Sequence, residues 1–307
     1  MRISVQQAIS QLKAGKVAAL PTETVYGLAA SLSQPKAIEE IFRLKGRPLA
    51  NPLIIHVGSI SDVEHYASEI PPEFNELAAA FWPGPLTLIV PVQPDLVPPL
   101  VRAHLPTAGF RMPCHPLTLA VIKAAGPVVM PSANLSGRPS ATTYEHVEAD
   151  FGKDFSVLNG GPCSKGLEST ILYYVQSSWV IGRLGALAAE EFETILGYVP
   201  ALFKPEKPIC PGQFFRHYAP KAKLYLGDRS RLDEVSFILG FIEGHYPPDK
   251  KVLLMGSLYN AEEVAEHLYQ VLRKLDMEGA DAAWIDMDFP REGLWKTIEE
   301  RLLKAGE

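Results

Sequence analysis

The sequence predicts a mixed α/β protein of two domains joined by a proline-rich linker, and three observations carry this prediction. Helix and strand patterns alternate through residues 1–200, four prolines fall within residues 201–221, and a regular strand–helix alternation fills residues 222–307. The first part is therefore expected to form an α/β or α+β domain with a mixed sheet. The last part is expected to form a small α/β domain with a parallel sheet.

In the first domain, apolar residues that recur every three to four positions predict helices, whereas short β-branched runs predict strands. The predicted helices cover residues 3–12, a segment after Ser33 that ends near Lys45, 74–82 and 116–125. The predicted strands cover residues 17–20, 52–57, 86–90, 109–113, 128–130, 169–175 and 179–183.

The second domain repeats a strand–helix unit. Strands are predicted at residues 223–226, 251–255 and 282–287, with one helix between the first two strands and further helices at 261–275 and 294–304. The linker before this domain also carries aromatic and basic residues, which a simple spacer does not need.

Composition excludes several classes of protein. The net charge of −6, from 29 basic and 35 acidic residues, argues against a general nucleic-acid binder. The cysteines Cys114, Cys163 and Cys210 form no C-x-x-C pair, so no disulfide framework or zinc site is indicated. The first residues lack the apolar core of a signal peptide and no apolar run approaches membrane-span length, so we expect a cytoplasmic protein.

Two polar segments follow predicted strands, where α/β proteins tend to bind ligands. Thr22, Glu23 and Thr24 end the first strand, and Lys45 and Arg47 flank a glycine one helix later. A lysine and an arginine fixed on a stiff turn can hold a polyphosphate. Two solvated charges at a helix end, favoured by the helix dipole, would explain the same pair.

The second polar segment is the loop from Ser132 through Asn134 to Ser140, whose hydroxyls and backbone N–H groups could bind phosphate or sugar. A serine-rich turn is the other interpretation. The chain has neither a Walker G-x-x-x-x-G-K-[ST] pattern nor a Rossmann G-x-G-x-x-G pattern.

Three isolated polar residues, His56, Arg111 and Arg183, lie inside apolar runs. A lone histidine in a strand is usually a core or surface residue, but buried arginines need anionic partners. The two arginines therefore indicate either an anionic ligand or an internal salt bridge to Glu23 or Glu168.

Taken together, these segments resemble the YrdC-like family. The segments that carry the resemblance are, in chain order, Pro21-Thr-Glu-Thr-Val-Tyr-Gly-Leu28, Lys45-Gly-Arg-Pro48, Asn51-Pro-Leu53 with His56, Trp82-Pro-Gly-Pro-Leu-Thr87, Arg111-Met-Pro113, Pro131-Ser-Ala-Asn-Leu-Ser-Gly137 and Glu168-Ser-Thr-Ile171. The linker, with Arg216-His-Tyr-Ala-Pro220, resembles the longer branch of the family, the two-domain L-threonylcarbamoyladenylate synthases. The resemblance covers residues 1–221, and the last domain only by size and position.

The resemblance implies a twisted mixed sheet around a concave pocket, followed by a small Rossmann-like domain. It implies a nucleotidyltransferase that converts L-threonine, bicarbonate and ATP, with Mg²⁺, into threonylcarbamoyl-AMP, pyrophosphate and water. Other tRNA-modification proteins would take the product, and no membrane or stable nucleic-acid binding is expected.

The resemblance also implies roles for individual residues. Lys45 and Arg47 would be catalytic. The implied threonine contacts are Thr24, His56, Arg111, the Met130 backbone and Ser169. The implied ATP contacts are Arg47, Asn51, Thr107, Ser132, Asn134, Ser140, Arg183 and Tyr218. Residues 209–220 are hypothesised to act as a lid. The sequence predicts no metal site made of protein side chains, and no catalytic residue is assigned to the last domain, whose sequence departs from the family pattern at residues 292–297.

Two alternative functions follow from the same fold. One is an RNA-binding or ribosome-maturation module, whose RNA affinity would fall steeply with salt. The other is carbamoyl transfer from carbamoyl phosphate, which the absence of an accompanying acylphosphatase-like or zinc-type sequence disfavours.

Overall fold

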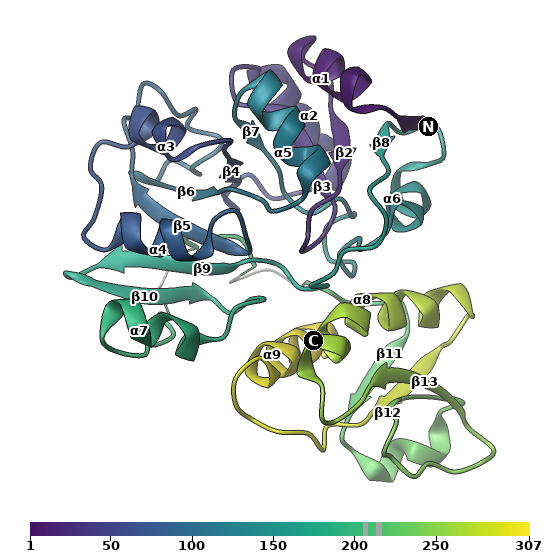
Figure 1. Ribbon diagram of the computed structural model, residues 1–307. Helices are drawn as coiled ribbons and strands as arrows, with labels where there is room; N and C mark the ends of the chain where they lie inside the picture. The colour runs from purple at the N-terminus through teal and green to yellow at the C-terminus, as the bar shows by residue number, and fades with distance from the viewer. Residues whose placement is uncertain (205–207, 213–216) are drawn as a thin grey trace.

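The computed structural model describes residues 1–204, 208–212 and 217–307, which form two β-sheets with helices packed on them (Figure 1). The larger sheet has ten strands and lies in the N-terminal domain. Its strands are β1 (Arg2–Ile3), β2 (Ala18–Leu20), β3 (Gly27–Ser31), β4 (Ile54–His56), β5 (Leu86–Pro91), β6 (Thr107–Arg111), β7 (Val128–Val129), β8 (Val157–Leu158), β9 (Thr170–Val175) and β10 (Ser178–Arg183).

The larger sheet is mixed, as the sequence predicts. Its strand order is β1-β8-β2-β3-β7-β4-β6-β5-β9-β10. The β4–β6 and β5–β9 pairs are parallel, while β3–β7, β5–β6 and β9–β10 are antiparallel. Strands β7, β4 and β6 are consecutive in this order, although they come from distant parts of the chain.

Helices cover both faces of this sheet. They are α1 (Val5–Lys13), α2 (Pro35–Lys45), α3 (Ile60–Tyr66), α4 (Phe74–Phe81), α5 (Pro116–Ala125), α6 (Tyr144–Phe151) and α7 (Glu193–Leu196), the last preceded by a 3₁₀ helix at Ala189–Phe192. Alternate residues of β3 point to opposite faces. Ala29 packs in a cluster with residues of α1 and α5, whereas Leu28 and Ala30 pack in the cluster that contains the apolar residues of α2.

Helix α2 ends as the sequence predicts. Gly46 adopts a left-handed conformation (φ 62°), and its N–H bonds back to the Arg43 carbonyl at 3.3 Å. Glycine has no Cβ and adopts this conformation without strain, and Pro48 follows shortly after. The turn therefore directs Lys45 and Arg47 into the protein, and both are buried.

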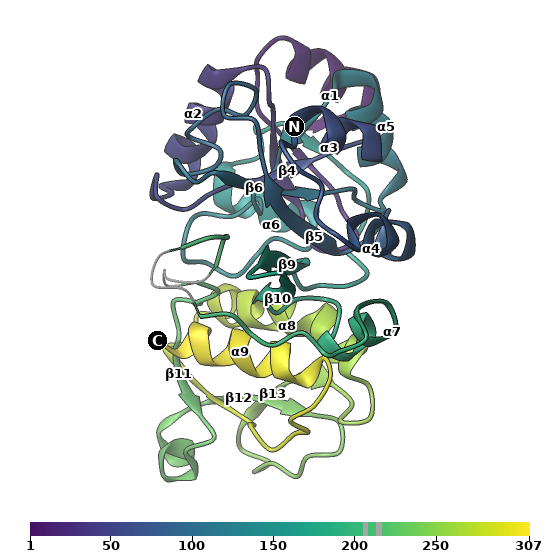
Figure 2. The ribbon, with the colours of Figure 1, turned by 90° about the vertical axis from the view of Figure 1, so that its left-hand side faces the viewer.

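The C-terminal domain contains the second sheet, which has four strands and is entirely parallel. In sheet order its strands are β11 (Lys223–Leu226), β14 (Ala282–Ile285), β12 (Phe237–Phe241) and β13 (Lys251–Gly256). Helices α8 (Ala261–Met277) and α9 (Trp295–Gly306) pack on one face of it. Figures 1 and 2 show these two helices between the four-stranded sheet and strands β9 and β10. The C-terminal domain thus faces the N-terminal domain with its helices.

One predicted element is wrong. The segment between β11 and β13 was expected to be a helix, but it contains a 3₁₀ helix at Arg229–Glu234 followed by β12. The apolar run of β12 is buried on both sides, and such a run lacks the alternation that distinguishes a strand from a buried helix. The strands β1, β3 and β8, the helices α3, α6 and α7, and the 3₁₀ helix at Ala189–Phe192 were not predicted.

The boundaries 1–200, 201–221 and 222–307 stay a prediction, and residues 205–207 and 213–216 of the linker lie outside the described residues. Across the described parts of the chain, no helix is both long enough and apolar enough to cross a membrane.

Candidate active site

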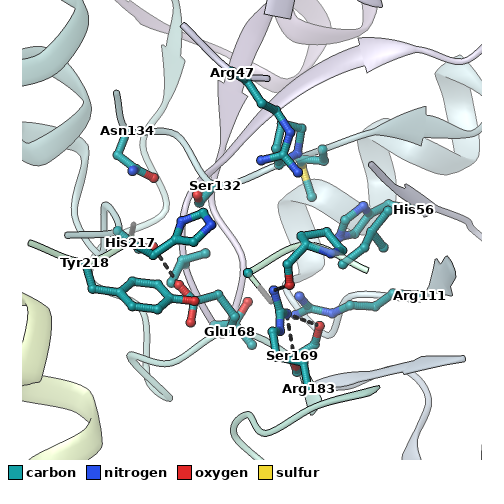
Figure 3. A pocket seen from close by; sticks show the side chains of 18 of the residues that line it. Arg47, His56, Arg111, Ser132, Asn134, Glu168, Ser169, Arg183, His217 and Tyr218 are labelled. Atoms are coloured by element: carbon teal, nitrogen blue, oxygen red, sulfur yellow. Dashed lines mark hydrogen bonds between the residues drawn. The ribbon is translucent and has the colours of Figure 1, made fainter. Parts of the chain in front are cut away.

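A cavity lies at the strand ends of the N-terminal domain, with about 620 Å³ of empty space that is partly open to solvent (Figure 3). Linker residues and strand ends from distant parts of the sequence line it together. The predicted site residues on its wall are Thr24, Arg47, His56, Arg111, Met130, Ser132, Asn134, Ser140, Ser169, Arg183 and Tyr218. The structure therefore brings most of the predicted residues into one site.

The loop after β2 presents Thr24 to the cavity. The Thr22 hydroxyl donates to the Val25 carbonyl at 2.6 Å and lies 2.7 Å from the Thr24 hydroxyl. Both threonines are buried. This closed turn explains how the polar strand end keeps its shape before β3 begins.

Arg111 forms the internal salt bridge that the sequence left open. Its Nη2 donates to Glu23 Oε1 at 2.5 Å, and its Nε donates to the Gly84 carbonyl at 3.2 Å. Both side chains of the pair are at least nine-tenths buried. Arg111 nevertheless lines the cavity, so its threonine contact stays a prediction that must hold beside the ion pair.

Arg47 lies on the opposite wall of the cavity from Ser169 and Arg183 (Figure 3). Its Nε donates to the Asn51 carbonyl at 3.1 Å and its Nη2 to the Pro52 carbonyl at 2.7 Å. Burial, with the nearby charge of Arg183, lowers the pKa of Arg47 to about 9. The guanidinium is thus fixed in orientation and still charged at neutral pH, which suits an anionic ligand.

Lys45 is fully buried behind the cavity wall and takes a different position from Arg47. Its Nζ donates at 2.5 Å to the carbonyls of Ser132 and of Asn134. Burial, and then the charge of Arg47, lowers the pKa of Lys45 well below its usual value. In this structure Lys45 therefore holds the shape of the polar loop, and its direct catalytic role stays a prediction.

Lys45→Met is expected to lower the free energy of unfolding by about 2–6 kcal/mol, since two buried carbonyls would each lose a donor at a cost of about 1–3 kcal/mol. Urea denaturation of the variant measures this loss. Lys36→Met, at an exposed position of the same helix, is the matched control and should leave stability within about 0.5 kcal/mol. Equal stability of the two variants would show that Lys45 does not hold the loop.

The loop after β7 carries Ser132, Asn134 and Ser140. Asn134 Nδ2 donates to the carbonyls of Leu135 (2.8 Å) and Arg138 (3.0 Å), so the amide braces its own turn. The Ser140 hydroxyl donates to Glu168 Oε1 at 2.6 Å. The loop is therefore a braced structure that borders the cavity.

Ser169, directly before β9, and Arg183, at the end of β10, line the cavity. The hydroxyls of Ser169 and Thr87 lie 2.8 Å apart, and Arg183 Nη2 donates to the Ser169 carbonyl at 2.8 Å. The sequence left open a salt bridge from Arg183 to Glu168, but Glu168 pairs with Arg301 of the C-terminal domain. Arg183 is buried and reaches the cavity.

Two predicted ATP contacts are placed beside the main cavity. Thr107, at the start of β6, lines a smaller pocket of about 250 Å³ beneath it, together with Ile54 and Pro211. Asn51 lines a neighbouring open pocket that shares His217 with the main cavity. Their contacts with ATP stay predictions.

The linker closes one side of the cavity with Pro211, Gly212, His217 and Tyr218. Tyr218 has a φ of 65°, which is unusual for a bulky side chain. The proposed lid spans residues 209–220, of which 213–216 lie outside the described residues. The lid stays a prediction.

Buried polar atoms without a hydrogen-bond partner gather at this site within the described residues. They include His56 Nδ1, Asn134 Oδ1, Arg183 Nε and His217 Nε2. Buried polar atoms are nearly always paired in folded proteins. Four orphaned atoms around one cavity indicate that a polar ligand supplies the partners.

The cavity is electrostatically positive and its histidines are neutral. Burial, and then the charge of Arg111, lowers the pKa of His56 well below its usual value. Burial, and then the charge of Arg47, lowers the pKa of His217 to about 3. A neutral imidazole can accept a hydrogen bond, while the buried cations favour a ligand with negative charge.

The contacts that the C-terminal domain makes with a residue of the cavity were not predicted from the sequence. Tyr269 of α8 and Arg301 of α9 both donate to Glu168, which lines the cavity. One signal was present in the sequence: Arg301 lies on the apolar face of α9, beside Ile298 and Leu302. A charged residue on a buried helical face needs a partner, here Glu168.

No group of three or more histidine, cysteine, aspartate or glutamate side chains could hold a metal ion among the residues that the structure describes. Glu168, whose carboxylate lines the cavity, already accepts hydrogen bonds from Ser140, Tyr269 and Arg301.

Comparison with known proteins finds counterparts for both domains. A family model for Sua5, YciO and YrdC proteins, described as "Telomere recombination", matches residues 10–185, and one described as "Threonylcarbamoyl-AMP synthase, C-terminal domain" matches residues 187–306. The chain is 38% identical to the threonylcarbamoyl-AMP synthase of Bacillus subtilis, over 98% of this chain and 92% of that protein. It is 37% identical to the threonylcarbamoyl-AMP synthase of Pyrococcus abyssi, over 98% and 93% respectively.

The same relation holds in three dimensions. The crystal structure of P. abyssi Sua5 complexed with L-threonine superposes with a TM-score of 0.91 at 33% identity, covering 100% of this chain and 96% of that one. The two-domain architecture is therefore shared along the whole chain.

Proposed function

The chain belongs to the Sua5/YrdC family of threonylcarbamoyl-AMP synthases, and from this premise we propose how its cavity converts L-threonine, bicarbonate and ATP into threonylcarbamoyl-AMP. Membership makes the chain a nucleotidyltransferase that uses ATP and acts in tRNA modification. The observation that carries the proposal is the gathering of orphaned polar atoms and buried cations around one cavity.

Threonine would bind at the side of the cavity formed by Thr24, His56, Arg111 and Ser169. Arg111 can pair with the carboxylate of threonine. The neutral His56 can accept a hydrogen bond from the threonine amine or hydroxyl. The threonine complex of the archaeal relative supports this choice of amino acid.

ATP would bind along Arg47, Ser132, Asn134, Ser140 and Arg183. Arg47 and Arg183 reach the cavity from opposite walls, so their guanidinium groups can contact different parts of a triphosphate. The unpaired Asn134 Oδ1 and His217 Nε2 can bind polar atoms of the nucleotide.

The reaction proceeds in two steps. The threonine amine, having lost a proton, attacks the carbon of bicarbonate, and water leaves to give an N-carboxylate. An oxygen of this carbamate then forms a bond to the α-phosphorus, and the bond to the β-phosphate oxygen breaks to release pyrophosphate.

The protein contributes orientation and charge in both steps. Holding two substrates in the reactive orientation can lower the activation free energy by up to about 7–11 kcal/mol in favourable intramolecular cases. The buried cations oppose the negative charge that develops on the phosphate oxygens. The walls formed by Tyr218 and His217 limit the access of water to the labile carbamate.

Mg²⁺ would accompany ATP, where it neutralises phosphate charge. Because the described residues present no group of acidic or histidine ligands, the phosphate oxygens and water would supply most of its coordination. Downstream, other tRNA-modification proteins would receive threonylcarbamoyl-AMP, and the cytoplasm is the expected compartment.

The purified chain with ATP, Mg²⁺, bicarbonate and L-threonine is expected to yield threonylcarbamoyl-AMP and equimolar pyrophosphate. Mass spectrometry detects the first and a coupled phosphate assay the second. Omission of threonine or bicarbonate should abolish both products. Absence of product, together with RNA binding that weakens steeply with salt, would overturn the proposal in favour of an RNA-binding module.

A further inference from the structure

The negative charge of Glu168 is unfavourable for a triphosphate in this cavity. Its carboxylate lines the cavity and accepts a hydrogen bond from Ser140, a predicted ATP contact. An uncompensated carboxylate at this place would repel a triphosphate. Water would screen this charge little, because only 7% of Glu168 is exposed.

The C-terminal domain supplies the compensating charge. Arg301 Nε donates to Glu168 Oε2 at 3.1 Å, and Tyr269 OH donates to the same oxygen at 2.9 Å. Both side chains are fully buried. Burial alone would raise the pKa of Glu168, but the charges of Arg301 and Arg183 and the Ser140 hydrogen bond lower it to about 2. At neutral pH the contact is therefore an ion pair.

The same two side chains hold a second wall of the cavity. The rings of Tyr269 and Tyr218 stack with centroids 5.3 Å apart, and the Arg301 guanidinium lies 4.8 Å from the Tyr218 ring centre. Lys304, one turn further along α9, donates to the carbonyl of Gly212, another cavity residue, at 2.7 Å. Helix α9 thus holds the linker where it borders the site.

Helix α8 also fixes the loop that carries Ser140. Arg273 Nη2 donates to the Pro139 carbonyl at 2.6 Å and to Asp150 Oδ2 at 2.8 Å. Gly166 (φ 68°) packs so closely on the backbone of α8 at Ala265 and Glu266 that a Cβ there would clash. The interface therefore fixes groups on the nucleotide side of the cavity.

We propose that Arg301 and Tyr269 of the C-terminal domain are positioning residues for ATP, because they compensate the charge of Glu168 and hold Tyr218 against the cavity. This inference rests on the proposed function, since it takes ATP as the ligand beside Glu168 and Ser140. Among the described residues, none of the C-terminal domain lines the cavity, so Arg301 and Tyr269 act through Glu168 and Tyr218. An interface that only joined the domains would affect stability without preference for one substrate.

Arg301→Met is the first test. The variant is expected to raise KM for ATP about tenfold or more, because 1.4 kcal/mol of lost binding equals a factor of ten. KM for threonine should change less than twofold. Arg301→Lys, which keeps the charge but loses the planar fork, should give an intermediate KM for ATP. Lys296 also lies on α9 and forms an exposed pair with Glu190 of the N-terminal domain, so Lys296→Met should leave both KM values unchanged.

The double variant Glu168→Gln/Arg301→Met tests the charge argument. Because Glu168→Gln removes the cavity carboxylate that Arg301 compensates, the KM of the double variant for ATP should lie below that of Arg301→Met alone. If Arg301→Met does not fold, Tyr269→Phe keeps the stacked ring, loses only the hydroxyl and should still raise KM for ATP selectively.

Two results would overturn the inference. One is an unchanged KM for ATP in Arg301→Met or, if that variant does not fold, in Tyr269→Phe. The other is an equal rise in both KM values with no recovery in the double variant, which would make the contact an ordinary interface. Failure of the wild-type chain to form threonylcarbamoyl-AMP would instead count against the proposed function.

Discussion

Arg47→Met is expected to reduce kcat/KM for ATP by about 10²–10³-fold, the usual effect of removing one preorganised donor from a developing anion. Arg47 is buried, is fixed by two backbone carbonyls and faces the cavity, so its charge cannot be replaced by water. Methionine retains much of the side-chain volume, which limits the loss of packing. Steady-state kinetics with varied ATP and saturating threonine measure the change.

Arg43→Met is the matched control for Arg47→Met. Arg43 lies in the last turn of α2, just before the Gly46 turn that carries Arg47, but it is exposed and paired with Glu40. Such surface pairs contribute about 0–1 kcal/mol, so the control should keep wild-type kinetics. If Arg47→Met keeps wild-type activity, the catalytic role proposed for Arg47 is wrong.

Arg111→Met is expected to weaken threonine binding by about 100-fold, or about 2.8 kcal/mol, since the buried charge pair between Arg111 and the threonine carboxylate would be lost. It should also lower the free energy of unfolding by about 3 kcal/mol, because Glu23 would remain buried without its partner. Calorimetric titration with L-threonine measures the first effect and urea denaturation the second.

Glu23→Gln separates the two roles of Arg111. It breaks the same ion pair but leaves the arginine charge available to the ligand, so threonine binding should be kept or strengthened while stability falls. If Glu23→Gln and Arg111→Met lose threonine affinity equally, the arginine serves only the salt bridge and the threonine contact is wrong.

Local patterns in the sequence were sufficient to predict those elements whose conformation depends on residues close to them in the chain. The end of α2 at Gly46 follows from glycine's tolerance of a left-handed conformation. Alternation of helices and strands gave the mixed sheet and the parallel C-terminal sheet. The same reasoning failed at β12, because an apolar run buried on both sides has no periodicity to identify it.

The candidate site divides in the same way. Ordered motifs predicted the residues that line the cavity, since each motif is a short segment with its own polar groups. They could not show that Lys45 bonds to the Ser132 carbonyl, or that Thr107 borders a separate pocket. Those facts depend on how β3, β7 and β6 are ordered in the sheet.

By itself the sequence determined the fold class, the family and most of the cavity wall, because these follow from local patterns and from motif order. The pairing of the buried charges, in contrast, is visible only in three dimensions. Arg111 has Glu23 as its partner, and Glu168 is compensated by Arg301, 133 residues away. The physical reason is that a buried charge takes its partner from whichever segment the fold packs beside it, and no local pattern identifies that segment.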